Sequence, residues 1–168
     1  MCKKFRQKVW ALRHLRKSNF TEDELIKVYT SYIRPTVEYS APIYHPMLTA
    51  EQTHKLENLQ YFALKNIYGF QYSHRQLLDL AKLPTLRLRR EEMTKKFAQK
   101  TSTNPRFKHW YPVRKTGGRR GQPVQYQEKQ ARTDRRRNSP IFYYRRILNE
   151  NRIDYDVRKK RMWRPSVP

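Results

Sequence analysis

The leucines of this chain are unevenly placed, and their placement limits where a core can form. Thirteen of the fourteen leucines lie before residue 100. Periodic aliphatic side chains of this kind can build the core of a helical domain. The later residues hold one leucine among many cations, a composition that leaves a chain little to bury. We therefore expect a small folded domain followed by a segment that depends on a partner for order.

The same two regions differ in charge. The chain has 38 Lys and Arg residues against 14 Asp and Glu residues, for a formal net charge of +24. Residues 1–84 carry 13 basic and 7 acidic side chains, whereas residues 85–168 carry 25 and 7. Self-repulsion on this scale opposes a compact state unless polyanions neutralise it. RNA and DNA are the partners that this charge favours.

The sequence disfavours several other classes of protein. No apolar run approaches the length of a membrane span, and no apolar stretch follows the basic start as in a secretory signal. We expect no membrane partner and an intracellular ribonucleoprotein, in the nucleus or the cytoplasm, not a secreted protein. The single cysteine, Cys2, allows neither an internal disulfide nor a thiolate metal site.

Periodicity and capping signals predict a mainly α fold, with about five helices before residue 101 and no strand alternation. Thr21, Thr49 and Ser73 each precede a Glu or Gln by three residues, which is the spacing of a capping box. Gly69 is a natural C-terminal stop. The expected helices are one over 3–17, one opened at Thr21, a long one over 50–68, a short one capped at Ser73, and a last one from Pro84 to about Lys100. A further short helix, from Pro35 to Tyr39, is expected between the second and the third.

Two faces of these helices carry specific expectations. In the helix opened at Thr21, a core stripe is expected at Leu25, Val28, Tyr29 and Tyr32. In the last helix, Leu86, Met93 and Phe97 point to the core. Arg89, Lys96 and Lys100 line up beside them and form a basic stripe that suits phosphate contacts.

The composition predicts a second region over 102–168, basic, largely irregular and partly disordered, with mobility expected over 113–138. An Arg-rich glycine loop over 116–121 lacks the pattern of a phosphate loop and is either a flexible loop or an RNA contact. One short helix is expected near 140–149, opened by Pro140, with Ile141, Tyr144 and Leu148 on one face.

Aromatic and basic residues alternate over residues 106–111. Cations that pair with phosphates, beside flat rings that stack on bases, are the combination that holds single strands. The alternative is that Phe107, Trp110 and Tyr111 pack onto the helical core, and the two readings are compatible. The candidate nucleic-acid-binding residues are Arg89, Lys96, Lys100, Arg106, Lys108, Trp110, Tyr111, Arg114, Arg119 and Arg120.

The sequence offers little material for catalysis. The five histidines are scattered, with no ligand spacing for a metal. Asp154 and Asp156 form the closest pair of aspartates outside a helix cap, whereas two-metal phosphoryl chemistry needs several convergent carboxylates. We expect no catalytic centre, no cofactor, no metal and no small-molecule substrate.

Two stretches carry a family resemblance. Residues 29–44 read YTSYIRPTVEYSAPIY, and residues 56–69 read LENLQYFALKNIYG. Both strongly resemble segments downstream of the polymerase palm in the reverse transcriptases of non-LTR retrotransposons, where the patterns run roughly y-x-s-x-I-R-P-x-x-E-Y-x-x-P-x-W and L-E-x-x-Q-x-x-A-x-K-x-I-x-G. Leu86 with residues 89–90, residues 104–107 with 110–112, and residues 139–141 with 148–149 are also similar to later motifs of that family.

The resemblance implies a thumb-like helical bundle over residues 1–101 and a post-thumb extension over 102–168. Tyr44 stands where the family usually has Trp. No Tyr-x-Asp-Asp motif of the palm is found, so the resemblance implies polymerase activity for a missing part and not for this chain by itself. Arg34, Pro35, Glu38 and Tyr39 are its structural motif. Arg34 is either a buried partner of Glu38 or a phosphate contact.

Three functions follow as expectations. The first is a fragment that binds an RNA or DNA template–primer and derives from a retrotransposon RNA-directed DNA polymerase. The second is part of an active reverse transcriptase whose palm and fingers are encoded upstream and act as its partner. The third is a small basic ribonucleoprotein component, against which the motif at 29–44 argues.

Overall fold

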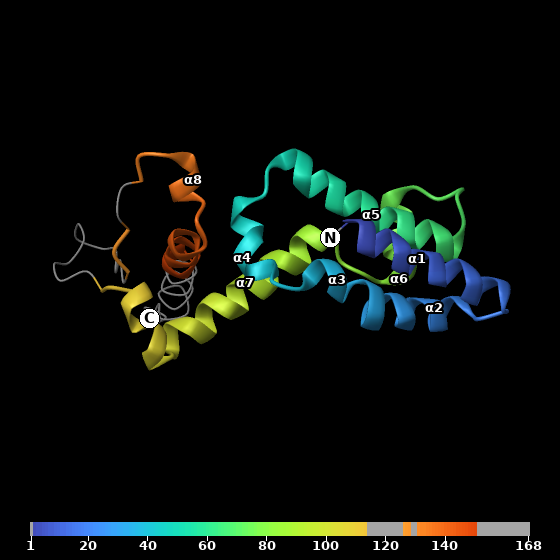
Figure 1. The fold of residues 1–168 in the computed structure, drawn as a ribbon, viewed down its shortest axis with the longest axis horizontal. Helices are drawn as coiled ribbons and strands as arrows, with labels where there is room; N and C mark the ends of the chain where they lie inside the picture. The colour runs from blue at the N-terminus through green and yellow to red at the C-terminus, as the bar shows by residue number, and fades with distance from the viewer. Residues whose placement is uncertain (1, 114–125, 129–130, 151–168) are drawn as a thin grey trace, which may run out of the picture. The chain divides into compact units, whose positions relative to one another are not determined.

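The structure, a computed structural model, describes residues 2–113, 126–128 and 131–150. This part of the chain is mainly helical and contains one isolated β-bridge, between Val113 and Tyr126. The predicted mainly α fold is confirmed. The chain divides into two compact units, Met1–Glu92 (unit 1) and Met93–Pro168 (unit 2), so the division falls inside helix α7, Leu86–Thr103 (Figure 1). The composition of the sequence changes later, near residue 101.

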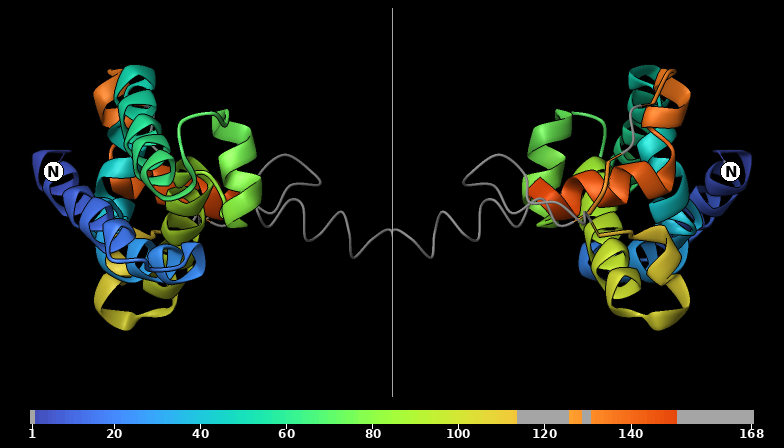
Figure 2. Two further views of the ribbon diagram at one scale, coloured as in Figure 1. Left: turned by 90° about the vertical axis from the view of Figure 1, so that its right-hand side faces the viewer. Right: turned by 90° about the vertical axis from the view of Figure 1, so that its left-hand side faces the viewer.

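Unit 1 is a bundle built on two long helices. Helices α1 and α5 lie side by side, α2 packs against both, and α6 packs against α5 (Figure 2). The short elements between α2 and α5 form an irregular connection. The elements are α1 (Cys2–Lys17), α2 (Glu22–Val28), the π-helical turn η1 (Tyr29–Ile33), α3 (Pro35–Glu38), α4 (Ala41–Tyr44), the 3-10 turn η2 (His45–Met47), α5 (Ala50–Tyr68), α6 (His74–Ala81) and the first turns of α7.

The predicted helix boundaries in unit 1 are confirmed where a cap defines them. Thr21, Thr49 and Ser73 each form a complete capping box. The side chain of the cap residue accepts from the amide three residues later, and the Glu or Gln there accepts from the amide of the cap residue. Helix α5 ends at Gly69, whose φ of 111° lies in a region that other residues rarely adopt. These local hydrogen bonds mark where the helices begin and end.

The core of unit 1 is aliphatic, and one predicted position in it is wrong. Leu25 and Tyr29 are buried as expected, but Tyr32 is 56% exposed and Ile33 is fully buried in its place. The cause is η1, where the amide of Arg34 donates to the carbonyl of Tyr29, five residues back. A π-helical turn adds a residue to the helical repeat and shifts every later side chain around the axis.

The predicted apolar stripe of α7 is only partly correct. Leu86 is fully buried, but Met93 and Phe97 are half-buried. The fully buried positions after Leu86 are Arg90, Thr94 and Ala98. The prediction assumed that a core face is apolar, whereas Arg90 is buried because an acidic partner, Glu57, lies within ion-pair distance.

Unit 2 contains a small core of its own. Its described elements are the rest of α7, the 3-10 helix η3 (Pro105–Trp110), α8 (Asp134–Arg137) and a helix over residues 140–150. The predicted helix near 140–149 is confirmed. The described residues of the extension are mostly helical, because aromatic rings supply the burial that the missing leucines cannot. The expectation of a largely irregular extension over 102–168 stays a prediction, because many of those residues lie outside the described ones. The core residues are Ala98, Tyr111, Tyr144, Ile147 and Leu148, with Phe97, Phe107, Trp110, Tyr126 and Tyr143 packed against them.

Candidate nucleic-acid interface

The motif residues of unit 1 form a buried ionic cluster. The carboxylate of Glu38 lies 3.1 Å from Nε of Arg34 and 3.2 Å from Nε of Arg89. The side chains of Arg34 and Glu38 are 15% and 10% exposed. Two roles were predicted for Arg34, and in the structure it is the buried partner of Glu38. Arg89, a predicted phosphate contact, shares the same carboxylate, although 36% of its side chain remains exposed.

The second motif positions the start of α7. The carboxylate of Glu57 accepts hydrogen bonds from the backbone amides of Leu86, at 3.1 Å, and Arg87, at 2.6 Å. Gln60 accepts from the same Leu86 amide and donates to the carbonyl of Pro84. A carboxylate at a helix N-terminus satisfies free amides and complements the helix dipole. These two side chains of α5 therefore cap α7.

The surroundings of this cluster shift the pKa of two side chains in the α4–η2 segment. Burial raises the pKa of Tyr44, whose hydroxyl donates to the carbonyl of Val37. Burial and the nearby Arg90 guanidinium lower the pKa of His45. Pro35 occupies the first turn of α3 as predicted, and Tyr39 is 81% exposed. The motif thus acts mainly as a scaffold, with Tyr39 left on the surface.

The aromatic–basic stretch over residues 106–111 divides between surface and core. Arg106 and Lys108 are exposed. Tyr111 is 4% exposed, and its hydroxyl lies 2.6 Å from Oγ1 of Thr101, so its ring packs in the core of unit 2. Trp110 is half-buried, with its ring centroid 4.6 Å from that of Phe107. The packing alternative therefore describes Tyr111, while Trp110 keeps part of its ring accessible.

Two polar side chains on the 140–150 helix form hydrogen bonds to the backbone of other segments of unit 2. Arg145 is buried and donates to the backbone carbonyls of Trp110, at 2.6 Å, and Gln127, at 3.3 Å. Asn149 accepts from the amide of Tyr126 and donates to its carbonyl, both at 3.2 Å. Irregular backbone inside a core needs such partners. Burial also raises the pKa of Tyr111, and that of Tyr144 to about 12.

The remaining predicted contacts fall into two groups. Lys96 and Lys100 are exposed on α7. The predicted contacts Arg114, Arg119 and Arg120, with the glycine loop, Asp154 and Asp156, lie outside the described residues, as does most of the segment predicted to be mobile. The structure thus brings Arg106, Lys108 and Trp110 together on one short helix, η3, with Tyr111 directly after it.

Helix α1 carries a basic surface that the sequence reading missed. Its sixteen residues hold seven Lys and Arg side chains and no Asp or Glu. Arg13 and Arg16 reach across to Asn66 of α5, where they donate to its side-chain and backbone oxygens. Others are exposed to solvent, including Lys3, Lys4, Arg6 and Lys17. The signal was present in the sequence as a helix-length run without a single acid.

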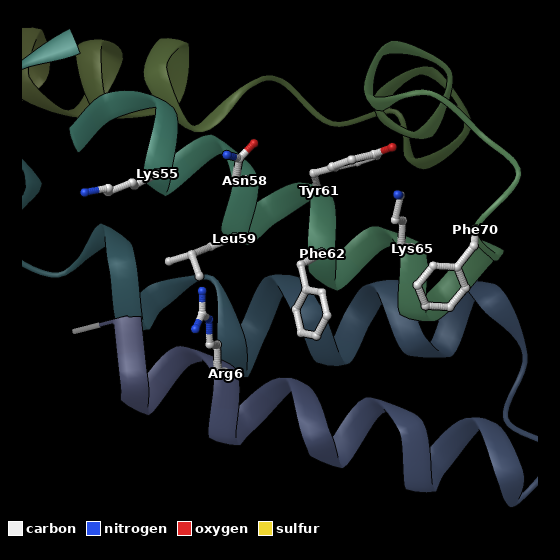
Figure 3. Close-up of a pocket in the computed structure, with 8 residues that line it drawn as sticks. All are labelled: Arg6, Lys55, Asn58, Leu59, Tyr61, Phe62, Lys65 and Phe70. Atoms are coloured by element: carbon white, nitrogen blue, oxygen red, sulfur yellow. The ribbon is translucent and has the colours of Figure 1, made fainter. Parts of the chain in front are cut away.

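A pocket of about 750 Å³ lies between α1 and α5 (Figure 3). Arg6 and Lys55 lie at one end of it, Lys65 and Phe70 lie at the other, and Phe62 lies between them. We call it the α1–α5 pocket; its lining residues are Arg6, Lys55, Asn58, Leu59, Tyr61, Phe62, Lys65 and Phe70. None of these is acidic, so the pocket suits an anionic ligand with a flat group.

Two kinds of feature are absent from the described residues. No group of His, Cys, Asp and Glu side chains in this part of the chain could hold a metal ion. None of its helices is long and apolar enough to cross a membrane.

Comparison with known proteins adds no family to this picture. No family model, no curated protein and no solved structure matches the chain. The resemblance of its motifs to non-LTR reverse transcriptases therefore stays a prediction from the sequence.

Proposed function

We propose that this chain is a nucleic-acid-binding segment without a catalytic centre of its own. The observation that carries the proposal is α1, a folded helix with seven Lys and Arg residues and no acidic side chain. Clustered exposed cations bind phosphates with little regard to sequence, because each bound phosphate releases counterions. The net charge of +24 supports the same partner.

We also propose that the segment derives from the thumb and post-thumb region of a non-LTR retrotransposon reverse transcriptase, whose palm and fingers would be its partner. The motifs at 29–44 and 56–69 support this origin. The structure gives those motifs a physical role, because Glu38, Glu57 and Gln60 connect the irregular segment, α5 and α7. A thumb needs such a stiff helical body to track a duplex through its phosphates.

The experiment is a salt titration of the full chain binding labelled duplex and single-stranded nucleic acid. If roughly six to ten phosphates are neutralised, affinity falls by about three to five decades between 50 and 200 mM salt. Lys3→Gln and Lys17→Gln, both on α1, should each reduce the salt slope by about one unit on every sequence tested. Affinity that does not depend on salt would contradict the proposal.

A matched control uses a lysine elsewhere in unit 1. Lys82→Gln changes the same charge at the end of α6, where the side chain is exposed. We expect it to leave the salt slope near the wild-type value. An equal effect of Lys82→Gln would mean that binding follows net charge alone and not the surface of α1.

A further inference from the structure

The α1–α5 pocket differs from the rest of the basic surface because aromatic rings accompany its cations. Phe70, just after Gly69, is 65% exposed and stands at the edge of the pocket (Figure 3). Lys65 Nζ lies 4.2 Å from the ring centroid of Tyr61 and 5.8 Å from that of Phe70. The positive φ of Gly69 turns the chain here, so Phe70 leaves the helix axis. An exposed ring beside a cation is the arrangement that stacks on an unpaired base and pairs with its phosphate.

The other end of the pocket is cationic. Arg6 projects from α1 toward Leu59, and Lys55 lies nearer the N-terminus of α5 (Figure 3). Lys55 also pairs with Glu51 at 2.6 Å, but both side chains are more than half exposed, so that pair is weak and exchangeable. Two cations are therefore available to phosphates next to a site for a flat ring.

We propose that the α1–α5 pocket binds a single-stranded segment of nucleic acid, with an unpaired base stacked on Phe70 and neighbouring phosphates paired with Arg6 and Lys55. The inference rests on the proposed function and names the form of nucleic acid that the site selects. An unpaired base offers its flat face to a ring, whereas bases inside a duplex are already stacked on each other. The volume of about 750 Å³ lies in the range of ligand sites.

The test separates stacking from charge. The full chain is titrated with a labelled strand of about 12 thymidine nucleotides and with an abasic strand of equal length, which keeps the phosphates and lacks the bases. Phe70→Leu keeps the apolar bulk and removes the aromatic face. We expect it to weaken binding of the thymidine strand by about fivefold or more, and to leave the abasic strand and the salt slope unchanged.

Two further variants make the result specific. Tyr39→Leu removes another exposed ring, 81% exposed and outside the pocket, and should change neither affinity. Arg6→Gln removes a charge, so it should weaken both strands and reduce the salt slope by about one unit. Unchanged circular dichroism checks that each variant is folded.

Several results would overturn the inference. Phe70→Leu could leave the thymidine strand unaffected, or it could weaken the two strands equally. It could also weaken binding of a polyglutamate peptide as much as that of the thymidine strand, which would make the occupant an acidic protein segment. If the wild-type chain binds both strands equally with a steep salt slope, the inference fails while the proposed function stands. If neither strand binds in a salt-dependent way, both fail.

Discussion

The two units of this chain bury different kinds of side chain. The core of unit 1 is mostly Leu, Ile and Val, contributed by long helices at helical spacing. The core of unit 2 is mostly aromatic, with Tyr111 and Tyr144 at its centre. A few rings can bury as much area as many aliphatic side chains. A region that looks too basic and too poor in leucine to fold can therefore still form a core.

The units also differ in how they satisfy buried polar groups. Unit 1 pairs charges, with Glu38 between Arg34 and Arg89. Unit 2 uses Arg145 and Asn149 as donors and acceptors for backbone that lies outside regular helices. Helices satisfy their own amides, whereas irregular segments need side chains for this purpose. The contrast predicts different weak points in the two units.

The largest expected effect is in the aliphatic core. Leu64 is fully buried on α5, and Leu64→Ala should lower the free energy of unfolding of unit 1 by about 2–5 kcal/mol. Leu80→Ala, at a position 49% exposed, is the control and should cost much less. Residue-resolved hydrogen exchange would measure both units at once. If Leu64→Ala reduced the protection of amides over residues 140–150 as much as that of amides in unit 1, the two cores would not be distinct.

The ionic cluster of unit 1 should give the next largest effect. Glu38→Gln leaves Arg34 and Arg89 without their shared anion, at an expected cost of about 2 kcal/mol; the partial exposure of Arg89 limits this cost. Glu51→Gln removes the exposed pair with Lys55 and should cost less than about 0.5 kcal/mol. Chemical denaturation compares the two variants. Equal costs would show that the cluster contributes no more than a surface pair.

Substitution of Asn149 tests the hydrogen bonds from a side chain to irregular backbone in unit 2. Asn149→Leu preserves bulk but leaves the amide and carbonyl of Tyr126 without their partner, so we expect a loss of about 1–2 kcal/mol. The loss should appear as faster exchange over residues 126–128 and 140–150. Unchanged exchange there would mean that ring packing alone holds the segment.

The smallest expected effect concerns the tyrosine hydroxyls of unit 2. Tyr111→Phe removes the hydrogen bond to Thr101 and should cost about 1 kcal/mol at neutral pH. Folding raises the pKa of Tyr111 above 10 and that of Tyr144 to about 12. Their contribution to stability is therefore complete below pH 10 and is lost as the pH rises toward 12. Circular dichroism against pH should show a weaker alkaline loss for Tyr111→Phe; an identical curve would contradict this.

Local signals in the sequence determined several helix boundaries of unit 1. The capping boxes at Thr21, Thr49 and Ser73 and the stop at Gly69 depend on residues close in the chain, so the boundaries of α5 could be predicted. The helix over 140–150 was predictable for a similar reason, from Pro140 and its periodic apolar face. The charge of the chain likewise pointed to a polyanionic partner before any fold was known.

Tertiary structure decided what those signals could not reach. The π-helical turn exposes Tyr32 and buries Ile33, a shift that no count at a fixed period of 3.6 residues can anticipate. Arg90 lies on a core face because Glu57, far away in sequence, comes close to it. The α1–α5 pocket combines Arg6 of α1 with side chains over residues 55–70, more than forty positions later. Sequence patterns report the neighbours along a chain, whereas burial, pairing and pockets depend on which distant segments meet.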